Sequence, residues 1–552
     1  MAEGIKAASN VLAEFRKILE PCFGPNCKDV LMKSDTGTIY LSSCGDFIMD
    51  HLVLKHPVAK LIKDTVSVFK NSNGDYSKSF IIVLSHFSSQ FVGKYIDHKT
   101  SRNIETVNST LSNAALSLFH IRNCIKEKFS KCKISKDICS DEFIQSNGNI
   151  IHSLLLTSLT GKLDDTSKSK MMEIVCNIFR HPQFTYNMFE YLVRHFNDVC
   201  ISMIGLPFNK SHVIDGCFIA RESKPPEFKL ANARLVLISS IDVSTQDSKK
   251  ATLVLDKYDF HGGLQTSLEH TMYNLLIKVL SKHCVNVIFS ENPLPNRFSS
   301  SLNQLGIVIV PFVLEEDLQR LSELYNIPFI SGIYDLHNLT EKQIGATSMI
   351  ESMVLGRTKG CLLGPSAINE TSNTNKGDVL NIQILLCTPS QGLQVQYRHM
   401  LHNLFKIVSK TFCKENKQFT VVPSGGSFER YLSDILREHE KRNCIDDIEK
   451  SLCKILASSV EAIPHLLNRN SGYKQRLPDV AFAKSSISTD INLDALTIDC
   501  KTFSKMYFEP FHVKCELYVT LIEFVIQLVK IQYIIPVTRK TLVDHTLTDD
   551  EE

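Results

Sequence analysis

The sequence predicts a multidomain α+β protein with helical ends and an α/β centre. Its 552 residues exceed what a single hydrophobic core accommodates, so we expect several domains. Near both ends of the chain, apolar residues recur with a helical period, whereas in the middle short apolar runs alternate with helical patterns. This order indicates a nested arrangement, in which the two ends of the chain build one domain around an inserted α/β part.

The first part of the chain is expected to be helical, with one short strand. An amphipathic segment ends before Gly24-Pro25, and the β-branched and aromatic residues at 38–41 favour a strand. A second helix begins at Pro57, whose fixed φ suits a first helical turn. Its apolar face comprises Val58, Leu61, Ile62, Val66 and Phe69. The polar stretch from Phe129 to Asn149 is expected to be an exposed connection.

The centre of the chain alternates strand and helix patterns. Strands are expected at Leu235–Ile238, Val285–Phe289, Ile307–Val310 and Pro328–Ile330. One helix between them has its apolar face at Leu264, Leu268, Met272, Leu275, Leu276, Val279 and Leu280. A second has Leu314, Leu318, Leu321 and Leu324, which we expect to belong to the core. The alternation predicts a compact α/β domain with a largely buried sheet. Beyond it, 380–386 is strand-like, 395–408 is helical, and an acidic tail occupies 548–552.

Composition excludes several classes of partner. The formal net charge is +2 and no dense run of Lys and Arg occurs, so neither a nucleic acid nor an anionic membrane is an expected partner. The N-terminus lacks the apolar region of a signal peptide. The most apolar stretch near the C-terminus, 517–529, is interrupted by Thr520, Glu523 and Gln527, so no membrane insertion is expected. We therefore expect a cytoplasmic protein.

The seventeen cysteines are expected to be small buried hydrophobes. No Cys-x-x-Cys occurs, and the nearest approach to a cluster, Cys124, Cys132 and Cys139, fits no common zinc spacing. No structural metal is therefore expected. A redox or metal-binding protein is the alternative, and it would require stoichiometric zinc or a defined redox pair.

Two short segments, more than three hundred residues apart, contain the candidate functional residues. Asn73-Gly74-Asp75-Tyr76-Ser77-Lys78-Ser79 follows a helical pattern and runs into an apolar stretch. Glycine in such a loop lets main-chain N–H groups approach an anion, usually at a helix N-terminus. The second segment, Leu401-His402-Asn403-Leu404, lies inside another helical pattern. Taken alone, the first is also compatible with an ordinary surface turn, and Asn403 with a polar helix position of no importance.

The ordered series of motifs resembles a group II chaperonin subunit over nearly the whole chain. The first segment resembles the family's phosphate loop, Gly-Asp-Gly-Thr-Thr-Ser, and the second resembles Leu-His-Asp-Ala-Leu, whose Asp activates the water that attacks ATP. Further matches are Phe23–Cys27, Ser43–Gly45, His56–Lys60, Val213–Gly216, Val421–Gly426, Ala462–Pro464, Asn470–Gly472, Glu509-Pro510 and Val513-Lys514. The departures are most similar to the chaperonin-like proteins of Bardet–Biedl syndrome, on the basis of His56–Ile62, Lys78–Ile82, Gly205–Pro207, Leu386-Cys387 and Gly392-Leu393.

The resemblance implies a degenerate nucleotide-binding site for ATP and Mg²⁺. The residues it implies are Gly24, Pro25, Gly45, Gly74, Asp75, Ser77, Lys78, Ser79, Gly425, Gly426 and Glu509. Asp75 would be the candidate ligand of Mg²⁺. Tyr76 stands where the family has a glycine, and its ring is expected to obstruct the phosphate path.

Hydrolysis is expected to be lost. Asn403 stands at the family's catalytic Asp and cannot accept a proton from water, so no catalytic residue is expected. Cys44 stands where the family has a metal-side Asp, and Thr388-Pro389 replaces a Gly-Gly pair, which is expected to stiffen a hinge. His402 is not expected to substitute as the base, because a lone helical histidine is more often simply exposed.

The resemblance also implies domains and a function. Residues 1–147 and 409–552 would form a helical equatorial domain, 148–216 and 363–408 a small intermediate domain, and 217–362 an α/β apical domain with a protrusion at 244–263. The implied function is a chaperonin-like assembly factor for the BBSome and for ciliogenesis, located in the cytoplasm, at the centrosome and at the ciliary basal body. Its partners would be other chaperonin-like proteins and cytosolic chaperonin subunits, with BBSome subunits as clients. The alternative is an ATP-hydrolysing chaperonin subunit that folds cytosolic proteins.

Overall fold

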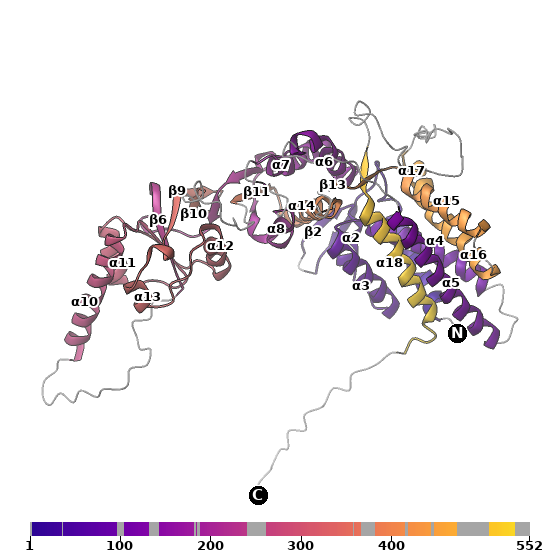
Figure 1. The fold of residues 1–552 in the computed structure, drawn as a ribbon, viewed down its shortest axis with the longest axis horizontal. Helices are drawn as coiled ribbons and strands as arrows, with labels where there is room; N and C mark the ends of the chain where they lie inside the picture. The colour runs from indigo at the N-terminus through magenta and orange to yellow at the C-terminus, as the bar shows by residue number, and fades with distance from the viewer. Residues whose placement is uncertain are drawn as a thin grey trace, which may run out of the picture. The chain divides into compact units, whose positions relative to one another are not determined.

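The chain folds into two compact units. The computed structural model describes residues 3–35, 37–96, 104–131, 143–181, 184, 188–239, 261–356, 358–365, 381–413, 418–442, 446–471 and 507–535. Unit 1 comprises Met1–Cys139, Ser153–Leu163 and Lys410–Glu552, and unit 2 comprises Ser140–His152 and Asp164–Ser409. Unit 1 therefore joins segments from both ends of the chain, whose colours in Figure 1 run from indigo to yellow. The finer division into five segments stays a prediction.

Unit 1 is a helical assembly around a largely buried helix. Helix α4 (Ser77–Tyr95) contacts α1 (Glu3–Leu19), α2 (Gly45–His51), α3 (Pro57–Asn73), α16 (Asp447–Val460), α17 (Ala462–Asn470) and α18 (Phe511–Lys530). The side chains from Phe80 to Leu84, with Phe87 and Phe91, have no exposed surface. Five consecutive residues cover the whole circumference of a helix, so burial of Phe80 to Leu84 requires neighbouring helices on every side of this part of α4. Helices α5 (Ile104–Lys131) and α15 (Ser427–Arg442) pack on the outside of this group (Figure 1).

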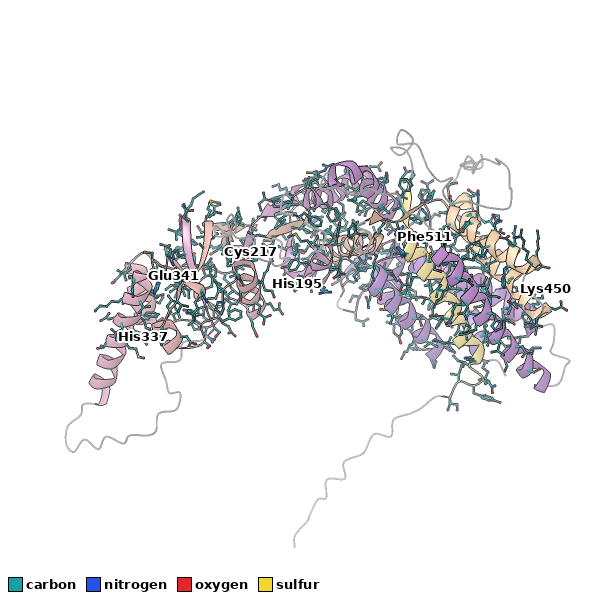
Figure 2. The ribbon with its side chains drawn as sticks, in the orientation of Figure 1. His195, Cys217, His337, Glu341, Lys450 and Phe511 are labelled. Carbon is teal, nitrogen blue, oxygen red and sulfur yellow. The ribbon has the colours of Figure 1, made fainter. Side chains whose placement is uncertain are left out.

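Short strands join distant segments of unit 1. β14 (Val421–Pro423) pairs antiparallel with β15 (Phe508–Pro510), with Val422 opposite Glu509. This pairing places the start of α15 beside the start of α18. Phe511, at the first turn of α18 (Figure 2), lies 6.0 Å from Phe428, ring centre to ring centre. Two further hairpins are β1 (Val30–Lys33) with β2 (Ile39–Ser42), and β12 (Phe412–Cys413) with β13 (Gln418–Phe419).

Unit 2 contains a six-stranded mixed sheet with a core on each face. The strand order is β5-β10-β9-β6-β7-β8, formed by Cys217–Ile219, Thr358–Leu363, Gly345–Leu355, Lys229–Ile238, Val287–Ser290 and Val308–Val310. Only β6, β7 and β8 run parallel. Leu235 and Leu237 of β6 pack with α12 (Glu315–Tyr325), whereas the alternate residues Val236 and Ile238 pack with α10 (His261–Lys282) and α11 (Asn296–Gln304). This alternation follows from the period of two in a strand.

A second, smaller sheet completes unit 2. β11 (Ile382–Thr388) runs parallel to β3 (Cys200–Ile204) and antiparallel to β4 (His212–Asp215). Every residue of β11 is buried, which is typical of a central strand. The further helices of unit 2 are α7 (Asp165–Phe179), α8 (Met188–Arg194), α9 (Phe196–Val199) and most of α14 (Gln391–Thr411), with the short α13 (Ile333–His337) near the large sheet. Helix α6 (Phe143–Leu159) begins in unit 2 and ends in unit 1.

Most of the expected elements are present. The strand at 38–41, the helix from Pro57, the strands at 235–238, 287–289 and 308–310, and the helix at 395–408 are confirmed. The strand expected at Pro328–Ile330 is wrong, because only a single bridge joins Ile330 to Ile238. Leu314 is 53% exposed and Leu61 36% exposed, so neither belongs to the core as expected. The long antiparallel strands β9 and β10 were not expected at all.

Some expectations lie outside the described residues. These concern residues 244–260, 132–142 and 548–552, and with them Cys132 and Cys139. The connection expected from Phe129 to Asn149 is wrong at both ends, because α5 continues to Lys131 and α6 begins at Phe143. Among the residues that the structure does describe, no three His, Cys, Asp or Glu side chains group together as a metal ion would require. No helix in the described ranges combines the length and apolarity that a bilayer crossing needs.

Candidate functional site

The loop that resembles a phosphate loop forms the turn between α3 and α4. Helix α3 ends at Asn73, and its C-terminal capping residue Gly74 has φ 92°. Tyr76 has φ 78° and ψ 9°, in the left-handed region. A residue with a side chain pays roughly 1–2 kcal/mol for this conformation. The backbone at Tyr76 therefore keeps a geometry that glycine adopts freely, although the residue is a tyrosine.

Asp75, the candidate Mg²⁺ ligand, is paired with Lys162. Lys162 Nζ lies 2.5 Å from Asp75 Oδ2, and the two side chains are only 13% and 17% exposed. Burial is the largest single influence on the pKa of Lys162 and lowers it, but the charge and hydrogen bond of Asp75, with the nearby Cys44 and Asp46, together outweigh burial, so the net pKa is raised. Asp75 is thus neutralised by a permanent cation, and a metal ion would have to displace that cation.

The turn that carries Lys162 packs against the Gly24-Pro25 turn. Gly161 has φ 76°, and a Cβ there would stand 3.0 Å from the carbonyl oxygen of Pro25 and closer still to that of Gly24. The thiol of Cys27 donates to the carbonyl oxygen of Gly161. A larger residue at 161 would push this turn away and withdraw Lys162 from Asp75.

Lys78 holds two neighbouring loops together. Its Nζ donates to the carbonyl oxygens of Cys22, at 2.7 Å, and of Ser43, at 3.1 Å. The side chain is 8% exposed, and its stem lies where a Cβ on Gly45 would be. The ammonium of Lys78, one of the expected nucleotide-binding residues, is thus engaged by main-chain carbonyls.

A buried ion cluster lies beneath Tyr76. Lys514 Nζ is 2.7 Å from Glu429 Oε1 and 3.1 Å from Glu509 Oε2, and it lies 5.0 Å from the centre of the Tyr76 ring. The hydroxyl of Tyr518 donates to the same Glu429 oxygen, at 2.9 Å. Lys514 is 2% exposed and Glu429 fully buried. Burial raises the pKa of Tyr76 and of Glu509, whereas the two carboxylates raise the pKa of Lys514 against the effect of burial.

The remaining site residues complete this arrangement within unit 1. Gly425 and Gly426 form the turn between β14 and α15, and a Cβ on Gly426 would stand 2.7 Å from Pro464 Cβ. Glu509 lies on β15, opposite Val422. All eleven predicted nucleotide-binding residues lie in the residue ranges of unit 1.

The residues do not fit a Mg²⁺–ATP complex as they lie. The side chains of Asn73 and Ser77, at the two ends of the loop, are fully buried and their polar atoms lack hydrogen-bond partners among the described residues, which would suit a phosphate or a water molecule. Against this, Asp75 and Lys78 are already paired. Cys44 is buried, and burial raises the pKa of its thiol to about 12, so it does not supply the anionic ligand of an Asp.

Asn403 and His402 lie on α14, in unit 2. Asn403 is 8% exposed. His402 stacks on Phe196, with ring centres 4.5 Å apart, and its Nε2 lies 3.2 Å from the carbonyl oxygen of Val193. The expectation that His402 is simply exposed is wrong, because the ring is half-buried. Burial lowers the pKa of His402 to about 4, so the ring is neutral at pH 7 and donates to Val193.

Sequence reasoning missed four residues of the site. They lie far along the chain from Asp75 and Tyr76, and none was selected as a site residue: Lys162, Glu429, Lys514 and Tyr518. A Gly-Lys pair directly after an apolar helical stretch was the available signal for Lys162. Nothing in the local sequence distinguishes Tyr518 from the other core aromatic residues.

We expect Lys514→Ala to lower the free energy of unfolding of unit 1 by about 3–5 kcal/mol, because it leaves the buried Glu429 without its cation. Urea unfolding, followed by hydrogen exchange of unit 1 peptides, measures the loss. Glu429→Gln with Lys514→Met should lose less, since no charge is stranded. Lys450→Ala is the control: Lys450 is 43% exposed, and its replacement should change stability by at most about 0.5 kcal/mol. If Lys514→Ala lowered the free energy of unfolding as little as the control does, the buried Lys514–Glu429 pair would not stabilise unit 1 as predicted.

We expect α14 to lose protection from hydrogen exchange in acid. The pKa of His402 is lower in the folded protein, about 4, than its ordinary value of 6.5. Its contribution to stability is therefore complete above about pH 6.5 and is lost as the pH falls through about 4. Exchange of α14 peptides, corrected for the intrinsic rate, should rise more from pH 7 to pH 4.5 in the wild type than in His402→Gln. The exposed His212, changed to Gln, should leave the wild-type response unchanged.

Comparison with known proteins places the chain among the chaperonins. The family model described as the TCP-1/cpn60 chaperonin family matches residues 15–539. The chain is 22% identical over 442 residues to "BBSome complex assembly protein BBS10" of Homo sapiens, which is 74% of this chain and 58% of that protein. It is 20% identical over 473 residues to a thermosome subunit of Desulfurococcus sp. (strain SY), which is 84% of this chain and 78% of that protein. The chain thus spans less than two thirds of the human relative.

A solved structure shows the same fold. A group III chaperonin in the open state aligns with a TM-score of 0.66 at 14% identity, covering 96% of this chain and 98% of that chain. The expected multidomain α+β chaperonin fold is confirmed, and so is the resemblance to a Bardet–Biedl chaperonin-like protein. The family model matches most of the length of this chain, so the chain belongs to the TCP-1/cpn60 chaperonin family.

Proposed function

We propose that this chain is a chaperonin-like assembly factor for the BBSome whose nucleotide site does not hydrolyse ATP. The observation that carries the proposal is Tyr76. It occupies a left-handed position in the phosphate loop, and its ring lies over the ammonium of Lys514. A main-chain cradle for phosphate requires close approach of the anion to N–H groups, and a ring at this point opposes that approach.

Two further features support a loss of hydrolysis. The Lys162 ammonium holds Asp75, so the carboxylate that would bind Mg²⁺ is engaged. Asn403, at the position of the family's catalytic Asp, carries no negative charge and cannot take up a proton. Removal of a general base typically costs about 10²–10⁴-fold in rate. Each feature alone would slow an ATPase, and together they favour a protein that acts without turnover.

The likeness to BBS10 supports the assembly role. The human, orangutan and mouse relatives carry the name "BBSome complex assembly protein BBS10", and each is 22–23% identical to this chain. In the proposal, the chain works with other chaperonin-like proteins and cytosolic chaperonin subunits on BBSome subunits as clients. Its place is the cytoplasm, at the centrosome and the ciliary basal body.

Affinity purification from ciliated cells tests the assembly role. The tagged chain should recover chaperonin subunits together with BBSome components, whereas the tag alone should recover neither. Recovery of neither class by the tagged chain would overturn the proposal.

A steady-state ATPase assay addresses the alternative, an ATP-driven folding subunit. Turnover that is abolished by Asp75→Ala would favour that alternative.

Replacing Tyr76 by glycine should increase ATP binding more than replacing Asn403 by aspartate. Tyr76→Gly removes the ring and relieves the left-handed strain, so Tyr76→Gly with Asn403→Asp should recover measurable ATP binding. Asn403→Asp alone should do little, because a general base acts only on a substrate that is already seated. Calorimetry or thermal unfolding is the readout, since ligand at a hundred times its Kd stabilises a protein by about 2.7 kcal/mol.

Tyr76→Phe is the matched control for this experiment. It keeps an aromatic ring at the same place and should not bind ATP better than the wild type. Turnover restored by Asn403→Asp alone would mean that Tyr76 is not the obstruction and that the native protein binds ATP.

A further inference from the structure

We propose that Cys124 is an activated nucleophile, a modification site for small electrophiles of the peroxide class, with His439 as its base and Glu449 as the residue that positions His439. Nothing in the nucleotide site or in the assembly role requires these three residues. They lie in unit 1, on three different helices: α5, α15 and α16.

The three side chains form a linear chain of hydrogen bonds from Cys124 through His439 to Glu449, called the relay below. Cys124 Sγ lies 3.3 Å from Nδ1 of His439, and Nε2 on the opposite side of that ring lies 3.1 Å from Oε1 of Glu449. His439 and Glu449 are only 11% and 12% exposed, so their hydrogen bond is shielded from water. Helix α16 packs against both α15 and α5, and this packing sets the positions of the three side chains.

The direction of the relay follows from the chemistry of its ends. An ionised carboxylate only accepts hydrogen bonds, so Nε2 of His439 carries the proton and donates it to Glu449. The neutral ring then presents the lone pair of Nδ1 to the Cys124 thiol. This is the arrangement that activates a nucleophilic cysteine: the thiol proton moves to the imidazole, and the imidazolium that forms is stabilised by the carboxylate.

The geometry does not suit a metal ion. The imidazole stands between the thiol and the carboxylate, so the three groups do not converge on one point. Among the described residues no group of three His, Cys, Asp or Glu side chains is placed to hold a metal. Other cysteines differ in their surroundings: the Cys27 thiol donates to a carbonyl oxygen, which keeps the proton on sulfur, and burial raises the pKa of Cys200 to about 11.

The accessible reagent is small. Cys124 is only partly exposed on α5, which favours hydrogen peroxide over a bulky acyl donor. The Cys124 thiolate attacks one peroxide oxygen, the S–O bond forms and the O–O bond breaks. Sulfur is oxidised by two electrons to sulfenic acid, and peroxide is reduced. The proton held by His439 leaves with the departing hydroxide as water, so His439 returns to its neutral form.

The wild-type protein provides the first test, because it contains a matched control. Cys284 is exposed in unit 2, and among the described residues its thiol has no hydrogen bond to a base. Peptide-resolved labelling at pH 7 with limiting iodoacetamide should modify Cys124 faster than Cys284, although Cys124 is less exposed. Dimedone trapping after dilute hydrogen peroxide should find sulfenic acid at Cys124 first. Labelling that follows exposure, with Cys284 ahead, would overturn the proposal.

Variants assign the roles. An ordinary cysteine is about 3% thiolate at pH 7, so His439→Gln should slow labelling of Cys124 by about 10- to 30-fold. Labelling of Cys284 should be unaffected, which shows that the loss is specific to Cys124, and unchanged hydrogen exchange of α5 peptides shows that unit 1 stays folded. Glu449→Gln should slow the labelling of Cys124 less than His439→Gln does. Glu449→Asp should restore part of the labelling rate, because it keeps the carboxylate that positions His439. An unchanged Cys124 rate in His439→Gln would refute the relay.

Discussion

The ion pair between Lys514 and Glu429, buried in the middle of unit 1, is the constraint on which the site depends. It joins α18 to α15, and Glu509 on β15 and the ring of Tyr76 complete the surroundings of the Lys514 ammonium. A buried charge is costly unless it is paired, so the helices that carry these residues have little freedom to move apart. The β14–β15 pairing acts on the same region from the main chain. The C-terminal segment is thereby attached to the loop between α3 and α4.

Next to this cluster, the charged side chains of the loop between α3 and α4 are paired with other groups of the protein. Lys162 neutralises Asp75, and Lys78 is held by the carbonyls of Cys22 and Ser43. Groups that would receive a ligand in an active chaperonin are thus used to connect the loops. Tyr76 keeps the backbone angles of a glycine and adds a ring. These residues thus stabilise the fold of unit 1 without a ligand, because their partners are other residues of the chain.

The sequence was a sound guide to elements with strong local periodicity. The helix from Pro57, the strand at 235–238 and the helix at 395–408 each have a pattern that spans several turns or alternations. It failed where pairing is non-local: β9 and β10 are stable because they pair with each other and with β6 and β5. It also failed at Leu314, which matches the apolar period of α12 but precedes the helix and faces solvent.

By itself, the sequence determined the chaperonin family, the positions of the loop residues and the two chemical departures at Tyr76 and Asn403, because these are properties of residue identity in order. Tertiary structure alone decided which groups meet. The partners of Asp75 and Tyr76, Lys162 and Lys514, come from segments 87 and more than four hundred residues away, and no local pattern encodes such contacts. The same holds for Cys124, which the sequence grouped with two nearby cysteines and which folding places beside His439. Packing of distant helices sets these neighbours, since burial compels each polar group to find a partner wherever the fold supplies one.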